Sequence, residues 1–344
     1  MPDDEWTDAL MSVEQLCGLL SFALTARAEL FEPKHETAFR VFNGFSEGCP
    51  TLVIDLYART LVLHDYAESE GTEKSDAVVL AVQAYLCAQL PWVQAVLLKR
   101  HRSPHLTERQ GVLLSGERVD RHIREHWVRY AIELQLHGEA SFYLDTRNLR
   151  VWALHTLTDK IVLNTFAYTG SLGVAAVAGG ARRVVHLDHN KMYLNVAKAS
   201  YSLNGFPIHK ADFQVGDFWT QINFLKRTEE HFDCVVLDPP FFSATNRGTV
   251  DLVNHSERVI NKVRPLINDG GYLVAINNAL FVSGAEYLQI LETLCNDGYL
   301  SIEELIPVPL DCAGYPRTIV SAPPVDPSPF NHPTKIVVLR VRRK

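Results

Sequence analysis

The sequence lacks the cysteine patterns that build metal sites and disulfide frameworks. Its six cysteines include no C-x-x-C pair and none that clusters with histidine. Zinc sites and secreted disulfide scaffolds both need closely spaced or paired cysteines. We therefore predict a chain with no bound metal and with reduced thiols, located in the cytoplasm. The cysteines are Cys17, Cys49, Cys87, Cys234, Cys295 and Cys312.

Long apolar runs and repeats are also missing. No stretch reaches the roughly twenty apolar residues of a membrane span, and the acidic beginning Met1-Pro-Asp-Asp-Glu5 has the wrong charge for a signal peptide. No internal repeat or low-complexity tract is present. The 344 residues, 47% hydrophobic and 21% charged, suit a soluble globular enzyme of two domains with no membrane partner.

The chain has no excess of positive charge, because its formal net charge is −7. Nucleic-acid phosphates need cations, so a polyanionic partner would have to bind local basic patches. These patches could equally be solvated faces, and the acidic balance leaves room for a substrate that is not a long polyanion. The patches are Lys99-Arg-His-Arg102 with Arg109, residues 118–129, Arg182-Arg183 and Arg340-Val-Arg-Arg-Lys344.

The first motif that is present is the succession of elements found in a nucleoside-binding unit. An apolar run over 160–166 predicts a buried parallel strand, residues 167–173 form a glycine-containing turn, and Asp188 ends a second apolar run, 183–187. An acid in this place accepts hydrogen bonds from ribose hydroxyls. A dinucleotide enzyme would have glycine at the position of Tyr168, so the sequence favours S-adenosylmethionine over NAD.

The second motif is Asp238-Pro-Pro-Phe-Phe242, at the end of the apolar run 232–237. A parallel strand delivers its terminal carboxylate to the crevice where open α/β sheets bind ligands. Two prolines stiffen the turn and lack N–H groups, which leaves carbonyls free to accept hydrogen bonds. An adjacent aromatic ring can stack on a flat base. The motif is typical of methyltransferases that act on planar bases; an acidic strand end before a rigid loop is the alternative.

The remaining pattern predicts an α/β fold with a Rossmann-like seven-stranded sheet and a smaller N-terminal α+β domain. We divide the chain into a helical segment (1–36), a small α+β domain (37–132) on the substrate side and a Rossmann-like domain (133–344). Within these, we expect a hairpin over 133–144 and a Pro-rich lid or passive loop over 322–333. The expected strands are 160–166, 183–187, 209–215, 232–237, 272–276, 302–308 and 335–341, and the expected helices are 76–90, 174–181, 191–203, 221–228, 253–263 and 285–295.

These motifs resemble the bacterial 23S rRNA methyltransferase family. Its members include large-subunit methyltransferases I and O, which make 5-methylcytosine, and the K half of K/L, which makes 7-methylguanine. The resemblance runs from about residue 37 to the C-terminus, and the PUA domain of several members has no counterpart. It rests on Phe166-Ala-Tyr-Thr-Gly170, Gly179-Gly-Ala181, Asn204-Gly205, Asp238-Pro-Pro-x-Phe242, Phe142-Tyr-Leu-Asp-Thr-Arg147, Phe39-Arg-Val-Phe42 and Thr51-Leu-Val-Ile-Asp-Leu-Tyr57.

The resemblance implies a class I methyltransferase with S-adenosylmethionine as its cofactor and 23S rRNA as its partner, in a monomer or homodimer. Asp188 would bind the ribose and Asp217 the adenine amine. The expected cofactor residues are Phe142, Arg147, Asn164, Phe166, Tyr168, Thr169, Gly170, Asp188, His189, Asp217, Phe218 and Asp238. The expected catalytic residues are Asp238, Pro239, Pro240, Phe241 and Asn278. The expected substrate residues are Phe242, Asn277, Lys99, Arg100 and Arg102.

One departure from the family bears on the chemistry. Counted from Gly270-Gly271, the nucleophilic cysteine of the 5-methylcytosine members falls at Asn278. Methylation of cytosine C5 needs a thiolate at C6, whereas guanine N7 already has an in-plane lone pair. We therefore expect transfer to a base nitrogen, as in 7-methylguanine formation. Alternatives are 5-methylcytosine formation with Cys312 as a displaced nucleophile, an exocyclic amine, a non-nucleic-acid substrate, or a non-catalytic S-adenosylmethionine-binding module for RNA assembly.

Overall fold

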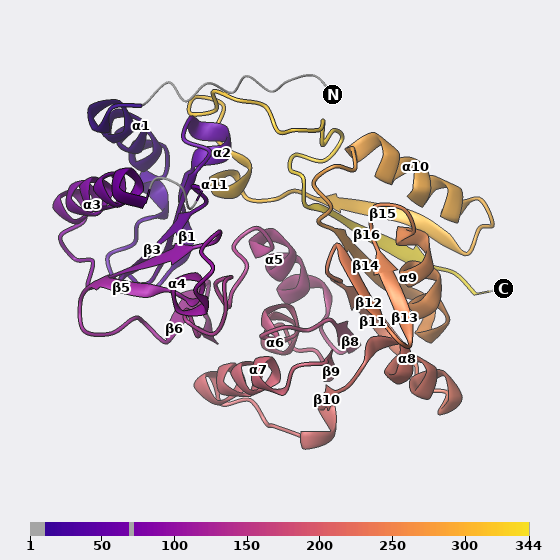
Figure 1. Cartoon of the computed structure of the whole chain (residues 1–344). Coiled ribbons are helices and arrows are strands. Elements are labelled where there is room, and N and C mark those ends of the chain that lie inside the picture. The colour runs from indigo at the N-terminus through magenta and orange to yellow at the C-terminus, as the bar shows by residue number, and fades with distance from the viewer. Residues whose placement is uncertain (1–10, 69–71, 344) are drawn as a thin grey trace.

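The computed structural model describes residues 11–68 and 72–343, which fold around two separate sheets (Figure 1). The first sheet has the order β1-β2-β3-β4-β5, with β3 and β4 parallel and the other pairs antiparallel. We call it, with its helices, the N-terminal lobe. Its strands are β1 (Ala38–Asn43), β2 (Leu52–Tyr57), β3 (Thr60–Asp65), β4 (Ala95–Arg100) and β5 (Val112–Ser115). Its helices are α1 (Val13–Ala26), α2 (Gly44–Glu47), α3 (Thr72–Gln89) and α4 (Leu106–Gln110).

One face of this first sheet is covered by α1 and α3, and the other faces the rest of the chain. Leu20 of α1 and Leu86 of α3 share an apolar cluster with Ile54 and Leu63 of the strands. Because successive side chains of a strand point to opposite faces, the neighbouring Val62 belongs to a different cluster, which it shares with the second lobe. The inner face of the N-terminal lobe is therefore packed against the C-terminal lobe.

The second sheet has the order β10-β9-β8-β11-β14-β16-β15 and forms the C-terminal lobe. Its first five strands are parallel, and β16 runs antiparallel to both of its neighbours. The seven-stranded Rossmann-like sheet expected from the sequence is thus confirmed, including its closing hairpin. The strands are β8 (Ile161–Thr165), β9 (Arg183–Asp188), β10 (Phe213–Val215), β11 (Phe232–Leu237), β14 (Ile267–Asn277), β15 (Leu300–Ile306) and β16 (Lys335–Val341).

Helices cover both faces of this sheet, as its buried parallel strands require. In β8, Val162 packs in the cluster of α5, α6 and α7, whereas Leu163 packs in the cluster of α8, α9 and α10. The helices are α5 (Arg147–Thr156), α6 (Ser171–Ala178), α7 (Lys191–Asn204), α8 (Phe218–Arg227), α9 (Ser256–Val263) and α10 (Gly284–Cys295). Across the described ranges, no helix is long and apolar enough to cross a membrane.

The hairpin expected over 133–144 is wrong. The hairpin lies earlier, in β6 (His122–Glu125) and β7 (Val128–Ala131), and 133–144 contains turns without a strand. The misleading alternation arises because this loop buries Leu134, Ala140, Phe142 and Leu144 in the core between the lobes. Side-chain burial at alternate positions is a strand signal only where a neighbouring strand supplies hydrogen bonds.

Among the elements not expected from the sequence are α5, the short hairpin of β12 (Phe242–Thr245) with β13 (Gly248–Asp251), and α11 (Leu310–Ala313). The last lies against β1 (Figure 1), where Asp311 accepts a hydrogen bond from the Arg40 backbone N–H at 2.9 Å. Arg147 of α5 donates two hydrogen bonds to the same carboxylate, at 2.7 and 3.0 Å. Asp311 therefore ties the two lobes together.

Candidate functional site

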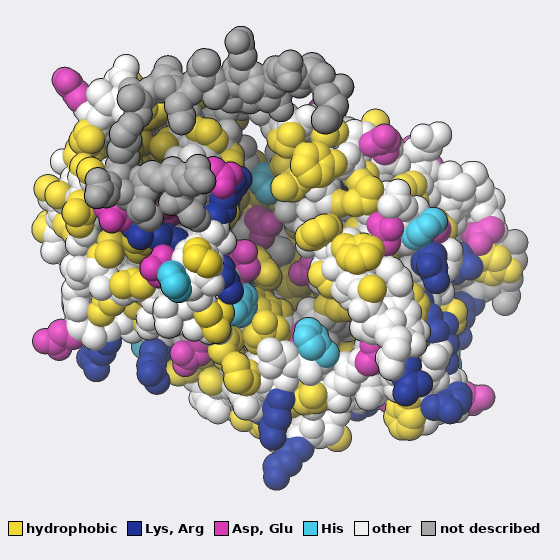
Figure 2. All heavy atoms as spheres, in the orientation of Figure 1, with side chains coloured by type: hydrophobic (Ala, Val, Ile, Leu, Met, Phe, Trp, Pro, Cys, Tyr) yellow, Lys and Arg dark blue, Asp and Glu magenta, His cyan; other side chains and the backbone are white. Residues whose placement is uncertain are grey.

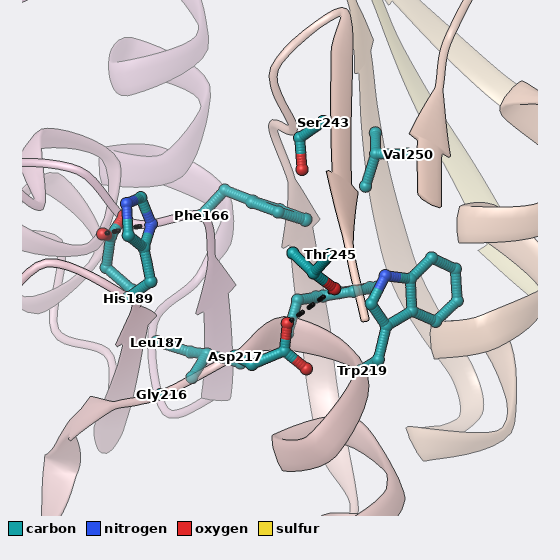
Figure 3. Close-up of a pocket in the computed structure, with 11 residues that line it drawn as sticks. Phe166, Leu187, His189, Gly216, Asp217, Trp219, Ser243, Thr245 and Val250 are labelled. Carbon is teal, nitrogen blue, oxygen red and sulfur yellow. Dashed lines mark hydrogen bonds and ion pairs between the residues drawn. The ribbon is translucent and has the colours of Figure 1, made fainter. Parts of the chain in front are cut away.

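A pocket lies at the carboxyl ends of β8 and β9, and the β12–β13 hairpin forms its opposite wall (Figure 3). Parallel strands present their ligand-binding crevice at this edge. We call it the strand-end pocket. It is lined by Phe166, Leu187, Asp188, His189, Gly216, Asp217, Phe218, Trp219, Ser243, Thr245 and Val250.

The turn after β8 has an unusual backbone. Phe166, Tyr168 and Gly170 have left-handed conformations, with φ of 50°, 50° and 79°. A Cβ on Gly170 would lie 2.6 Å from the Cβ of Ala197, so this position needs glycine both for its φ and for its space. The Tyr168 backbone N–H donates to Asp188 Oδ2 at 2.8 Å. Strained non-glycine residues of this kind gather at ligand sites, where the surroundings hold them in place.

Two carboxylates face the strand-end pocket. Asp188, only 7% exposed, uses one acceptor position for Tyr168 and another for the Asn190 backbone N–H at 2.9 Å. A carboxylate has about four such positions, so Asp188 can still accept from a ribose diol. Asp217 caps α8 through Oδ1, and its Oδ2 lies 3.5 Å from the Thr245 hydroxyl (Figure 3).

The pocket fits an adenosine that carries no phosphate. The rings of Phe166 and Phe218 are stacked with centroids 4.6 Å apart, which makes an apolar wall for a flat base. No lysine or arginine is among the described residues that line the pocket, whereas a pyrophosphate would need cations or bare backbone N–H groups. This residue set suits S-adenosylmethionine and matches the choice made from Tyr168.

Several expected cofactor residues support this pocket without lining it. Phe142 lies in the core between the lobes, and Asn164 is buried with its amide 3.4 Å from His186 Nδ1. The Thr169 hydroxyl donates to the Ser141 carbonyl oxygen at 2.5 Å. Arg147 is engaged by Asp311, so its guanidinium links the lobes. His189, in contrast, does line the pocket, at its rim, where its side chain is 79% exposed.

The Asp238-Pro-Pro turn and Asn278 lie together, at the ends of the neighbouring strands β11 and β14. Asn278 Nδ2 donates to the Pro239 carbonyl oxygen at 3.4 Å, and Asn278 Oδ1 is buried with no partner in the described part of the chain. Burial, together with the nearby Asp145 carboxylate, raises the pKa of Asp238 to about 7. A buried acceptor without a partner and a carboxyl with a raised pKa are both typical of functional sites.

The two asparagines have different surroundings. Asn277 Nδ2 donates to the Leu252 carbonyl oxygen at 3.1 Å, and its Oδ1 accepts from the Ala279 backbone N–H at 3.0 Å. Asn277 is thus a buried structural residue, and its expected substrate contact does not fit this position. Phe241 and Phe242 remain 60% and 53% exposed beside the turn, where they are open to a stacking partner.

Sequence reasoning missed the hairpin wall and Asp145. The two-residue loop Asn246-Arg247 between Thr245 and Gly248 was the available hairpin signal. The Trp219 indole lies over Gly248, where a Cβ would be 2.6 Å from the ring. Asp145 accepts a hydrogen bond from the Thr334 hydroxyl at 3.0 Å. It belongs to the element Phe142-Tyr-Leu-Asp-Thr-Arg147, but its nearness to Asp238 depends on long-range folding, which that local pattern does not reveal.

The expected phosphate contact at Lys99 does not fit the structure. Lys99 is fully buried on β4, and its ammonium donates to the carbonyl oxygens of His137 and Glu139 at 2.7 and 3.3 Å. Burial lowers its pKa to about 8. Arg100 and Arg102 form ion pairs with Asp76 and Glu68. The charged groups of this basic run are therefore already engaged, that of Lys99 by the segment before α5 and those of Arg100 and Arg102 within the N-terminal lobe.

The cysteines lie away from the strand-end pocket. Cys234 is inside β11 and Cys312 is inside α11, both fully buried, and burial raises the pKa of each thiol. The other four, in α1, after α2, in α3 and in α10, are partly exposed. Within residues 11–68 and 72–343, no group of three or more His, Cys, Asp or Glu residues could hold a metal ion.

The Rossmann-like sheet and its phosphate-free nucleoside pocket define a class I methyltransferase that uses S-adenosylmethionine. Residues 77–308 match the family model described as S-adenosylmethionine-dependent methyltransferase, and the chain belongs to this family. The protein is therefore an enzyme whose methyl donor is S-adenosylmethionine.

Individual relatives agree with this assignment. The chain is 28% identical over 291 residues to YwbD of Bacillus subtilis, covering 83% of this chain and 72% of the relative. It is 27% identical over 269 residues to ribosomal RNA large subunit methyltransferase I of Photobacterium profundum, covering 78% and 67%. These matches confirm the family resemblance seen in the motifs. The structure of SMU.776 complexed with SAH has the same fold, with a TM-score of 0.81, 22% identity and coverage of 96% of this chain and 82% of that one.

Proposed function

We propose that this methyltransferase acts on a base nitrogen in large-subunit ribosomal RNA, with N7 of guanine as the preferred acceptor. Its relative from Photobacterium profundum is named for large-subunit ribosomal RNA, which supports RNA as the substrate. The choice of the acceptor atom rests on the residues at the ends of β11 and β14.

Asn278 is the observation that carries the choice of nitrogen. It stands where cytosine-C5 enzymes of the resembled family have their nucleophilic cysteine, and its amide bonds to the Asp238-Pro-Pro turn at 3.4 Å. An amide cannot add to a pyrimidine ring as a thiolate does. The two described thiols nearest in sequence, Cys295 and Cys312, do not replace it, because Cys312 is sealed in α11 and Cys295 lies at the far end of α10.

The chemistry needed at guanine N7 is limited. S-adenosylmethionine supplies an electrophilic methyl group, and N7 already presents a lone pair in the plane of its ring. The protein must bind the donor, align the base and exclude water. Asp188, Asp217 and the Phe166–Phe218 pair would hold the donor. Phe241 and Phe242 would stack on the base, while Asn278 orients one of its edges.

Positive charge develops on the base as N7 is methylated. Asp238 and Asp145 lie close enough for one to raise the pKa of the other. Ionised carboxylates beside the base would stabilise a cationic ring, as preorganised charges do elsewhere in catalysis. The acidic character of this site thus favours a product with positive charge.

Transfer to an exocyclic amine is the second candidate. Such an amine loses a proton during methylation, and a carboxyl whose pKa is about 7 can accept one near neutral pH. The same Asp238 would then act as a general base. The two candidates place the methyl group on different atoms of the product.

Analysis of modified nucleosides tests the proposal. Ribosomal RNA from a strain lacking this protein is digested and compared, by mass spectrometry, with RNA from the strain carrying the intact or the Asp238→Ala protein. We expect one 7-methylguanine to be absent from the deletion strain and from the Asp238→Ala strain. Loss of a methylated exocyclic amine would select the second candidate, and loss of 5-methylcytosine would overturn nitrogen transfer.

A further inference from the structure

A second pocket lies between the two lobes, lined by Arg40, Asp55 and Tyr66 of the N-terminal lobe and by Glu139, Tyr143 and Asp145 of the segment before α5. We call it the lobe-interface pocket. The molecular surface is hollowed between the lobes, with acidic side chains in the hollow (Figure 2). Asp145 lines this pocket and accepts a hydrogen bond from Thr334, and the next residue, Lys335, pairs with Asn277 at the end of β14, beside Asn278. The pocket therefore adjoins the place proposed for methyl transfer.

The Arg40 guanidinium that lines this pocket already forms an ion pair within its own lobe. Arg40 and Asp55 are directly opposite each other on β1 and β2, and Arg40 donates to both Asp55 oxygens at 2.8 and 3.3 Å. His64 of β3 adds a third contact, with Nε2 at 3.4 Å from Asp55 Oδ2. The Asp55 carboxylate is thus paired with cationic groups of its own lobe, and the charge of Arg40 is already balanced by Asp55.

Two carboxylates of the pocket retain free acceptor positions. Asp145 Oδ2 accepts from Thr334, while no hydrogen bond reaches Oδ1 from any described residue. The Glu139 carboxylate is exposed, and it too receives no hydrogen bond within the described ranges. These acceptors repel a phosphate and attract a ligand that is rich in N–H donors.

Aromatic rings stand beside these acceptors. The Tyr66 ring is stacked on His101 with centroids 4.2 Å apart and an interplanar angle of 7°, which fixes its orientation. The Tyr143 side chain is 42% exposed and its ring lies 5.2 Å from that of Tyr168 in the turn after β8. Enzymes that act on an extruded base read its Watson–Crick edge with hydrogen bonds and stack its faces on aromatic side chains.

We propose that the lobe-interface pocket binds the Watson–Crick edge of the target guanine, with Asp145 and Glu139 accepting from its N1–H and N2 amine. This inference rests on the proposed function and names the residues that select its base. Guanine alone among the four bases presents two adjacent donor groups on that edge, whereas cytosine and adenine each present one. N7 lies on the opposite side of the guanine ring from N2. When the Watson–Crick edge occupies the pocket, N7 would therefore be directed toward Asp238 and Asn278.

The test uses a short RNA that contains the mapped target, synthesised with guanosine, inosine or 7-deazaguanosine at that position. Inosine lacks only the N2 amine, and 7-deazaguanosine lacks only the N7 acceptor. The variants are Asp145→Asn and Glu139→Gln, with Glu133→Gln as a matched control, because Glu133 is exposed on the same segment and does not line the pocket. Calorimetry with S-adenosylmethionine checks that each variant is folded.

We expect the intact enzyme to prefer guanosine over inosine by at least about tenfold in kcat/KM, since a site built to accept a donor rejects the analogue that lacks it. In the variant whose carboxylate receives the N2 amine, this preference should fall to about twofold, while Glu133→Gln keeps it in full. Such coupling between a side chain and a base group would not follow from a merely structural role.

Other outcomes separate this inference from the proposed function. Equal rates with guanosine and inosine, or full discrimination retained in both variants, would overturn the pocket assignment while leaving nitrogen transfer intact. Methylation of the 7-deazaguanosine RNA, or mapping of the methyl group to cytosine, would instead refute the proposed function, and the pocket assignment would fall with it.

Discussion

Asn278 donates a hydrogen bond from its amide to the carbonyl oxygen of Pro239, at 3.4 Å. This contact joins the end of β14 to the Asp238-Pro-Pro turn at the end of β11, two strands that are parallel neighbours in the sheet. Asn278 therefore lies in the same candidate site as Asp238. An amide at this point can orient a base, but it cannot form a covalent bond to one, and the proposed reaction follows from that difference.

Asp188→Ala should weaken S-adenosylmethionine binding by at least about tenfold, or about 1.4 kcal/mol. The carboxylate is expected to accept both ribose hydroxyls, and it also holds the strained turn through the Tyr168 backbone N–H. Titration calorimetry measures the affinity. Glu292→Ala, an exposed change on α10, is the control and should bind normally. Unchanged affinity in Asp188→Ala would refute the ribose assignment.

Asp238→Ala should abolish methyl transfer while cofactor affinity falls little. Loss of one well-placed polar group in a site without water typically costs about 2.7–4 kcal/mol of activation free energy. The measurement is turnover with rRNA from the deletion strain, beside calorimetry with the cofactor. Near-normal turnover would mean that Asp238 is only a structural strand end.

The same residue predicts a pH dependence of stability. Because the pKa of Asp238 is raised to about 7, the folded protein holds this proton between about pH 4 and pH 7, where an unfolded aspartate has lost it. The resulting stabilisation is present at low pH and is lost as the pH rises through 7. Relative to Asp238→Asn, the free energy of unfolding should fall over this window by at most about 1.4 kcal/mol per pH unit. Urea denaturation at several pH values measures it, and parallel curves for the two proteins would contradict the raised pKa.

Asp311→Ala should destabilise the fold by about 3–5 kcal/mol, since it leaves the Arg147 guanidinium and the Arg40 backbone N–H without their main acceptor. Glu303→Ala, which breaks an exposed pair with Arg340, should cost less than about 1 kcal/mol. Denaturant unfolding of both variants measures these values. Equal losses would show that Asp311 does not join the lobes as strongly as its contacts indicate.

Much of the C-terminal lobe could be predicted from the sequence because its signals are local. Buried parallel strands appear as continuous apolar runs, and Gly170 and Asn204-Gly205 mark turns that need a left-handed backbone. Asp188 and Asp217 could be placed at the carboxyl-end edge of the sheet because Asp188 ends β9 and Asp217 lies two residues after β10. The same reasoning applied to Asp238, whereas Asn278 was found by counting from Gly270-Gly271 against the resembled family. The structure places these two residues just after the neighbouring strands β11 and β14.

The missing parts depend on contacts between distant segments. Lys99 belongs to a basic run in the sequence, which suggests an exposed cation. In the structure its ammonium is buried and donates hydrogen bonds to the carbonyl oxygens of residues 137 and 139. Asp145 acquires its place only when the segment before α5 packs between the lobes, and Arg147 finds Asp311 across 164 positions of sequence. Neither hydrophobic periodicity nor the spacing of motifs reveals these long-range contacts.

Trapping with 5-fluorocytosine tests the central claim, nitrogen transfer without a thiol, most directly. A cysteine mechanism leaves a covalent protein–RNA adduct on fluorinated cytosine, because fluorine at C5 cannot leave as a proton. The purified protein, S-adenosylmethionine and fluorocytosine-containing rRNA from the deletion strain should give no adduct, and a digest should show the new methyl group on a nitrogen. Cys312→Ser should behave in the same way, since that thiol is buried. An adduct that forms with the intact protein and is lost in Cys312→Ser would contradict nitrogen transfer and establish 5-methylcytosine formation.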